Sequence, residues 1–252
     1  MRRTPPTAVA RQLRQEAGFG CADCGCPIVE YHHIVEWHER QHFEPEHMVA
    51  LCPTHHTEYG KLSRDKAYKV KQNPINVSKG RIKGFLGGNK KQKALRIGGV
   101  IVSDCESALN FSGIDIFSYA LEEEEFRLNV FIPDDCFWPE IEIKKNNLIA
   151  NTAEFWDIEF KTNWVKFRRK QRDIFLEIDF RGDHVEIDGE FNIGATTISL
   201  KEKNSQINHA QFSNVHLSGS RIGLAIGPEG RILKPNFAMT RPRMVYLPHW
   251  KR

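Results

Sequence analysis

The spacing of cysteine and histidine near the amino end constrains this chain more than any other feature. Cys21-x2-Cys24 is followed, after 27 intervening residues, by Cys52-x2-His55. Each short pair can place two soft ligands on one side of a tetrahedral Zn²⁺ ion. Four protein ligands leave no open position, which is typical of a structural site. The spacing therefore predicts structural zinc held by Cys21, Cys24, Cys52 and His55.

Two alternatives stay open for these cysteines. They can be ordinary buried thiols or a redox-active Cys-x2-Cys pair, and Cys26 can replace Cys24 as a ligand. Zinc is favoured because a domain of roughly 60 residues with few large apolar side chains needs a metal or another cross-link.

Composition restricts the chain to ordinary folded classes. Of its 252 residues, 40% are hydrophobic and 27% are charged, so it is too apolar for a disordered chain. No apolar run reaches the length of a membrane span, so we expect no membrane partner. No apolar stretch follows Arg2 and Arg3, which argues against a secretory signal and favours the cytoplasm.

Charge is unevenly distributed along the chain. Residues 1–95 contain 16 Lys+Arg and 9 Asp+Glu, whereas the rest contains 20 and 23. Four of the six cysteines and seven of the eleven histidines lie before residue 60. We therefore expect a small domain at 1–75, a basic linker at 76–95 and a second domain at 96–252.

Hydrophobic periodicity predicts a mixed α+β chain. A helix is expected between Pro6 and Gly18, followed by short strands within 28–35 and 48–51 and a second helix at about 54–71. Beyond residue 95, alternating stretches such as 174–180 favour a mainly antiparallel β domain, which can be a sandwich, a barrel or a β-roll.

Three of the histidines that are not zinc ligands lie on the expected strand and helix: His32, His33 and His56. Adjacent residues of a strand point to opposite faces, so His32 and His33 are expected to have different roles. His56 directly follows the zinc-ligand histidine at the start of a helix. Facing His32, it would make a two-ligand metal site open to water and phosphate oxygens.

Read in order, Cys21-x2-Cys24, the stretch 30–35 and the stretch 45–56 resemble the motif of the HNH endonucleases in its zinc-containing version. The match covers about residues 8–72. The resemblance implies the ββα-metal fold for a small nuclease domain, followed by a β-rich domain as in uncharacterised bacterial HNH proteins. It implies no biochemical role for that second domain.

The resemblance also assigns roles. It implies that His33 is the general base and that His32 and His56 bind a catalytic divalent ion, Mg²⁺, Mn²⁺, Ni²⁺ or Co²⁺. It supports the same four zinc ligands. His47 stands where the family usually has an asparagine that buttresses the base, so we expect weakened or retuned activity. His38 and His42, in the loop between the strands, are interpreted as surface residues.

Basic residues near this motif are candidates for phosphate contacts. Between Lys61 and Lys93 the chain has eleven Lys+Arg and one acid, which favours salt-sensitive binding to DNA. The alternative is a solvated charged face. The candidates are Arg40, Lys61, Arg64, Lys69, Lys79, Arg81 and Lys83.

The sequence thus favours a metal-dependent HNH endonuclease that hydrolyses DNA phosphodiester bonds in restriction or phage defence. The alternative is a zinc-containing nucleic-acid-binding module that does not cleave. Three roles remain open for the β-rich domain: DNA recognition, assembly of a homodimer, or regulation.

Overall fold

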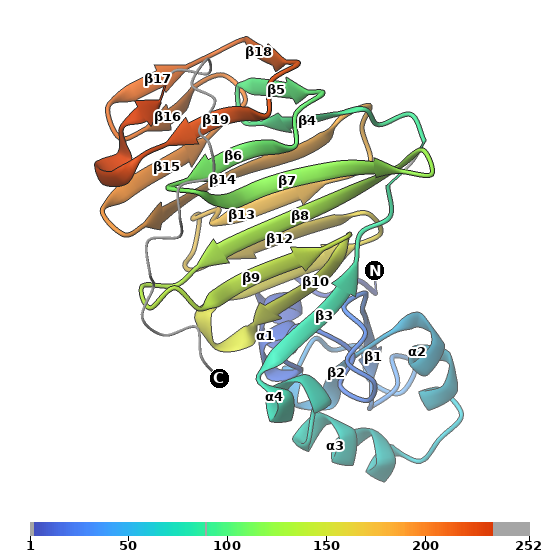
Figure 1. Cartoon of the computed structure of the whole chain (residues 1–252). Coiled ribbons are helices and arrows are strands. Elements are labelled where there is room, and N and C mark those ends of the chain that lie inside the picture. The colour runs from blue at the N-terminus through green and yellow to red at the C-terminus, as the bar shows by residue number, and fades with distance from the viewer. Residues whose placement is uncertain (1–2, 89, 234–252) are drawn as a thin grey trace. The chain divides into compact units, whose positions relative to one another are not determined.

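A computed structural model describes residues 3–88 and 90–233, and these form a mixed α+β structure built mostly from strands (Figure 1). The chain divides into two compact units. Of the described residues, the first unit comprises 3–87 together with 140–142 and 147–179, and the second comprises 88, 90–139, 143–146 and 180–233. Asn89 of the expected linker and 234–252 of the expected second domain lie outside the described residues.

The first unit begins with a β-hairpin and short helices, as predicted. Strands β1 (Glu30–His33) and β2 (Met48–Leu51) pair antiparallel, with His32 opposite Val49. The helical elements are α1 (Thr7–Glu16), η1 (Pro45–His47), α2 (Pro53–Tyr59), α3 (Arg64–Gln72) and α4 (Ile75–Lys79). The single helix expected at 54–71 is two helices, because α2 ends at Gly60 and α3 begins after Ser63.

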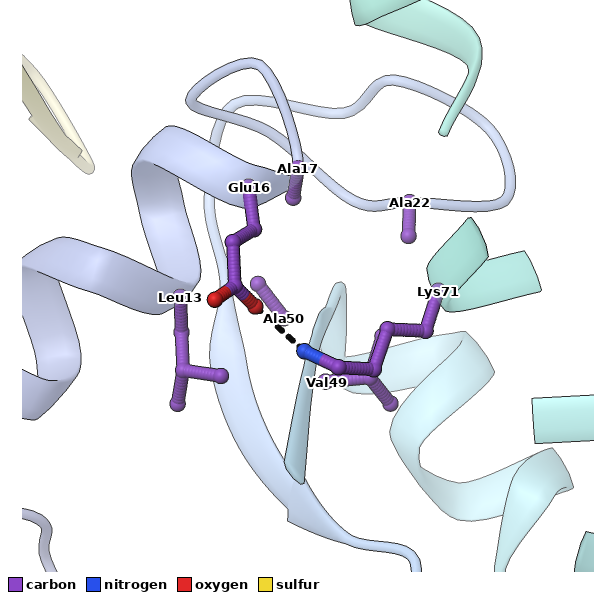
Figure 2. Close-up of a pocket in the computed structure, with 7 residues that line it drawn as sticks. All are labelled: Leu13, Glu16, Ala17, Ala22, Val49, Ala50 and Lys71. Atoms are coloured by element: carbon purple, nitrogen blue, oxygen red, sulfur yellow. Dashed lines mark hydrogen bonds and ion pairs between the residues drawn. The ribbon is translucent and has the colours of Figure 1, made fainter. Parts of the chain in front are cut away.

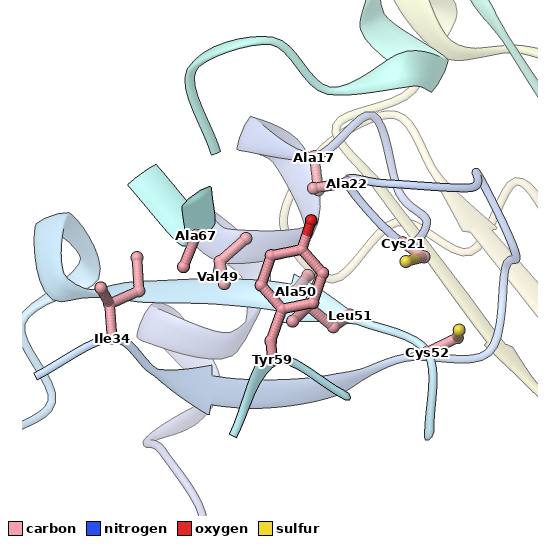
Figure 3. Packing of buried hydrophobic residues seen from close by; sticks show 10 residues of the cluster. All are labelled: Ala17, Cys21, Ala22, Ile34, Val49, Ala50, Leu51, Cys52, Tyr59 and Ala67. Atoms are coloured by element: carbon pink, nitrogen blue, oxygen red, sulfur yellow. The ribbon is translucent and has the colours of Figure 1, made fainter. Parts of the chain in front are cut away.

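The core of the hairpin and helices is small. Figure 3 shows the ring of Tyr59 beside the β2 side chains Val49, Ala50 and Leu51, with the sulfurs of Cys21 and Cys52 at one end. Four of the ten buried members of this cluster are alanines. Because each buried methylene contributes only about 0.8 kcal/mol, this core supplies little hydrophobic stabilisation.

An ion pair covers a small hollow at the edge of this core. Lys71 of α3 pairs with Glu16 of α1 above Leu13, Val49 and Ala50 (Figure 2). The enclosed space has no volume for a water molecule. The pair therefore closes α3 onto α1 and leaves no room for a ligand beneath it.

The first unit also contains strands that the sequence assigned to the linker and to the second domain. Residues 81–85, expected as linker, form β3 (Arg81–Phe85), which pairs antiparallel with β10 (Asn147–Asn151). β10 is followed by η2 (Thr152–Glu154) and by an antiparallel sheet of β11 (Asp157–Lys161), β12 (Trp164–Arg168) and β13 (Leu176–Asp179). A Cβ on Gly84 would lie 2.5 Å from the Phe160 ring, so glycine lets β3 pack closely on β11.

The second unit consists of strands, mainly in antiparallel hairpins. β9 (Pro139–Lys144) contributes residues to both units. The other strands are β4 (Ala94–Ile97), β5 (Val100–Ser103), β6 (Ser107–Phe111), β7 (Ile114–Glu122), β8 (Glu125–Pro133), β14 (Val185–Ile193), β15 (Thr196–Leu200), β16 (Ser205–Ile207), β17 (Ala210–Phe212), β18 (Val215–Ser218), β19 (Ile222–Ile226) and β20 (Ile232–Leu233). Pairing is parallel between β4 and β14, β5 and β18, and β6 and β19.

Aromatic rings hold the core of the second unit. Phe117 of β7 lies edge-on to Phe191 of β14, with ring centroids 6.0 Å apart, and Tyr119 stacks on Phe126 at 4.7 Å. The first contact joins strands distant in sequence, and the second joins the two strands of one hairpin. Among the described residues, none of the helices has the length and apolar character needed to cross a membrane.

Candidate functional site

The structure brings the four predicted zinc ligands together. His55 Nδ1 lies 3.3 Å from Cys21 Sγ and 3.5 Å from Cys52 Sγ, and the sulfurs of Cys24 and Cys52 are 3.9 Å apart. Tetrahedral zinc with usual bond lengths implies edges of about 3.8 Å between two sulfurs and about 3.5 Å between sulfur and nitrogen. The cluster therefore has the donor atoms and the spacing to hold a metal ion.

Backbone geometry places the sulfurs. The first pair lies on a tight turn in which Gly25 N donates to Cys21 O at 2.8 Å and Cys21 N donates to Cys26 O at 2.7 Å. Cys52 precedes α2, and His55 lies in the first turn of that helix. Cys26 is half-buried and lies outside the group of four, which supports Cys24 over Cys26 as the ligand candidate.

Asn76 supports this turn, and sequence reasoning missed it. Its side-chain amide donates to Gly18 O at 3.3 Å and to Gly25 O at 3.1 Å from a buried position on α4. Gly25 has φ +81°, and a Cβ there would lie 2.4 Å from Asn76 Oδ1. The glycines around the first cysteine pair were the only sequence signal of this close approach.

Electrostatics argues against a redox role for the Cys-x2-Cys pair. Burial is the largest cause that raises the pKa of the Cys24 thiol to about 12, and the neighbouring sulfurs of Cys21 and Cys52 contribute to this shift. A redox-active cysteine requires a lowered pKa. On the far side of His55, Nε2 lies 3.7 Å from Asp23 Oδ2. A carboxylate there can orient a metal-binding imidazole that uses Nδ1.

The second predicted site joins β1 and α2. The rings of His32 and His56 lie edge-on with centroids 5.2 Å apart. Burial, followed by the charges of His56 and His33, lowers the pKa of His32 to about 4, so its imidazole is neutral and able to bind a metal at neutral pH. Glu30, two residues earlier on β1, places Oε2 3.4 Å from His56 Nδ1. Sequence reasoning did not single out this glutamate.

His33 lies in different surroundings from His32, as the strand alternation predicted. Its Nε2 donates to His42 O at 3.2 Å, which leaves Nδ1 with the lone pair of the neutral ring. Trp37 and Phe43 lie beside the ring, at centroid distances of 5.2 and 6.2 Å. Burial lowers the pKa of His33, so this ring is neutral at pH 7.

His42 is not the surface residue expected from sequence. It is buried, its Nδ1 accepts from Glu44 N at 3.2 Å, and its Nε2 donates to Val35 O at 2.9 Å. These two bonds hold the loop whose carbonyl contacts His33. The sequence signal that could have predicted the burial of His42 is its position in a loop bounded by aromatic residues.

His47 does not contact the predicted base in the expected way. It ends η1, and its Nδ1 hydrogen-bonds to the hydroxyl of Tyr68 on α3 at 2.8 Å. Its ring lies 6.0 Å from that of His42. The group that holds His33 is therefore the backbone carbonyl of His42. Among the described residues, the ring of His47 contacts that of His42 and not that of His33.

Ion pairs engage part of the predicted phosphate-binding set. Arg40 pairs with Glu44 at 2.5 Å, and Arg64 pairs with Glu39. In each of these ion pairs the guanidinium of the arginine is bound to a carboxylate. The remaining candidates are exposed, and in the described part of the chain no carboxylate pairs with them: Lys61, Lys69, Lys79, Arg81 and Lys83.

Comparison with known proteins adds no relative. In the searches against models of protein families, curated proteins and solved structures, nothing matches this chain. The site must therefore be interpreted from its own residues.

Proposed function

We propose that the first unit carries a metal-dependent endonuclease head of the HNH type that hydrolyses DNA phosphodiester bonds. The observation that carries this proposal is that the ring centroids of His32 and His56 lie 5.2 Å apart, with His33 next to His32 on β1. Two imidazole ligands leave most positions of a divalent ion open to water and phosphate oxygens.

His33 supplies the base. With Nε2–H donated to His42 O, the free lone pair is on Nδ1, and the lowered pKa keeps it available at neutral pH. His33 Nδ1 takes a proton from the water that attacks the phosphate. The hydrogen bond to His42 O holds the ring in the same orientation before and after this transfer.

His32 and His56 would hold the divalent ion. When bound, Mg²⁺, Mn²⁺, Ni²⁺ or Co²⁺ supplies positive charge beside the scissile phosphate and the leaving oxygen. Glu30 accepts from His56 Nδ1–H in this arrangement, which leaves Nε2 as the ligand atom.

We assign Zn²⁺ to the cluster of Cys21, Cys24, Cys52 and His55. Three thiolates and one imidazole favour zinc over hard cations, and the alanine-rich core needs the extra stabilisation. The ion would anchor the start of α2, and so position His56, which directly follows a ligand.

Plasmid cleavage tests the proposal. The purified chain is incubated with supercoiled plasmid and each of the four divalent ions, alongside His33→Ala and His38→Ala. His38 is an exposed histidine of the loop that follows β1, so it is a matched control. We expect His33→Ala to lower the rate by a factor of about 10² to 10⁴ and His38→Ala to leave it unchanged. Undiminished metal-dependent nicking by His33→Ala would contradict the mechanism.

The second candidate is a nucleic-acid-binding module that does not cleave. It is favoured by the hydrogen bond of His47 to Tyr68, which leaves the base without the expected side-chain buttress. Binding of plasmid with no cleavage by the wild-type chain would support it. Digestion of unmodified, methylated and phage DNA side by side would test the proposed role in restriction or phage defence.

A further inference from the structure

Strand β3 presents basic and aromatic side chains along one face. Ile82 is buried, whereas Arg81, Lys83 and Phe85 alternate with it and are exposed, Phe85 by 53%. Alternate residues of a strand lie about 6.7 Å apart on the same face. Two cations and one aromatic ring therefore follow each other in a line on the surface.

The paired strand β10 extends this face with neutral side chains. Lys83 is opposite Ile149, which is 38% exposed. The two strands together show six residues on this face, and none of them is acidic: Arg81, Lys83, Phe85, Asn147, Ile149 and Asn151. The face thus combines positive charge, an exposed ring and amide groups.

β3 also lies at the edge of its sheet. β3 is the last strand of its sheet, with β10 as its neighbour, so one row of its backbone groups is unpaired by another strand. Lys79 lies just before it at the end of α4 and is exposed. The positive charge thereby continues beyond the strand.

We propose that the outer face of β3 and β10 binds single-stranded DNA. The cations contact successive phosphates, and the Phe85 ring stacks on an unpaired base. A duplex offers phosphates to Arg81 and Lys83, but its base faces are covered by stacking, so it cannot use Phe85. This inference deepens the proposed function, on which it rests, by assigning an unpaired strand as the form of DNA that the head engages.

Binding measured without cleavage tests this inference. The full-length His33→Ala chain, with no added divalent ion, is titrated against a labelled oligonucleotide, as a single strand and as a duplex, by fluorescence anisotropy. Phe85→Ala and Lys83→Ala are made in this background. Trp138→Ala is the control, because Trp138 is an equally exposed aromatic residue of the second unit, at 56%.

We expect Phe85→Ala to weaken single-strand affinity about tenfold and to change duplex affinity by less than about twofold. Lys83→Ala should weaken both and reduce the salt dependence. Equal losses for single strand and duplex, or a loss no larger than that of Trp138→Ala, would overturn the proposal. Loss of self-association in sedimentation, with unchanged DNA affinity, would assign the face to a second copy instead. If the wild-type chain failed to cut plasmid, the proposed nuclease activity would be refuted, but the measured binding of single-stranded DNA would not be affected.

Discussion

Arg14 of α1 and Asp157 of β11 form a buried ion pair with two hydrogen bonds. Arg14 Nε donates to Asp157 Oδ1 at 3.0 Å and Nη2 donates to Oδ2 at 2.7 Å, with the side chains 9% and 5% exposed. Arg14 Nη1 also donates to the hydroxyl of Tyr31 on β1 at 2.6 Å. One guanidinium thus joins the first helix, the hairpin and a strand 143 residues away within the first unit.

Removing the acid from this pair should destabilise the protein strongly. Asp157→Ala leaves the buried Arg14 charge without its carboxylate partner, and we expect the free energy of unfolding to fall by about 3–5 kcal/mol. Glu106→Ala is the control, because Glu106 belongs to an exposed pair with Arg221 and should contribute no more than about 1 kcal/mol. Urea denaturation measures both. Equal, small losses would show that the buried pair does not anchor α1.

Cysteine substitutions should separate metal ligands from ordinary thiols. Cys24→Ser and Cys52→Ser are expected to lose bound zinc and to lower the thermal midpoint, because each removes one of four ligands. Cys26→Ser and Cys136→Ser should retain both. Zinc content by elemental analysis and thermal melts are the measurements. Zinc loss in Cys26→Ser with retention in Cys24→Ser would transfer the ligand position to Cys26.

Glu30→Gln should weaken binding of the catalytic ion without affecting zinc. A carboxylate that accepts from a ligating imidazole orients it and increases its basicity, and its loss typically costs a factor of about 10 to 100 in metal affinity. Titration with Mn²⁺, followed by electron paramagnetic resonance, measures the affinity. Glu36→Gln is the matched control, because Glu36 contacts the exposed His38 at 3.0 Å. Unchanged Mn²⁺ affinity in Glu30→Gln would remove Glu30 from the site.

Local spacing was sufficient to predict the first helix, the hairpin and the cysteine and histidine cluster of the first unit. The helix before Gly18, the hairpin strands and the meeting of Cys21 with His55 all follow from residues that lie close in sequence or repeat at short intervals. These features depend on ligand spacing and strand alternation, which are visible in a one-dimensional pattern.

The pattern of charges along the sequence did not predict which basic side chains pair with carboxylates. Lys166, Arg168 and Arg169 read as a basic run, yet Lys166 pairs with Glu177, Arg168 with Glu159, and Arg169 with Glu140. The acids lie on other strands, so their positions relative to the basic run depend on strand register. The run of basic residues in the sequence therefore overstates the number of cations that have no carboxylate partner.

By itself, the sequence determined the four-residue cluster of cysteine and histidine and the order of the hairpin and the helix. It also determined that His32 and His33 lie on the hairpin and that His56 lies on the helix. Only the tertiary structure decided that β3 is a strand and that residues 147–179 belong to the first unit. It also decided that Arg14 is buried against Asp157. The physical reason is distance along the chain: short-range spacing sets backbone turns and ligand positions, whereas a buried pair or an edge strand depends on partners that pack together only on folding.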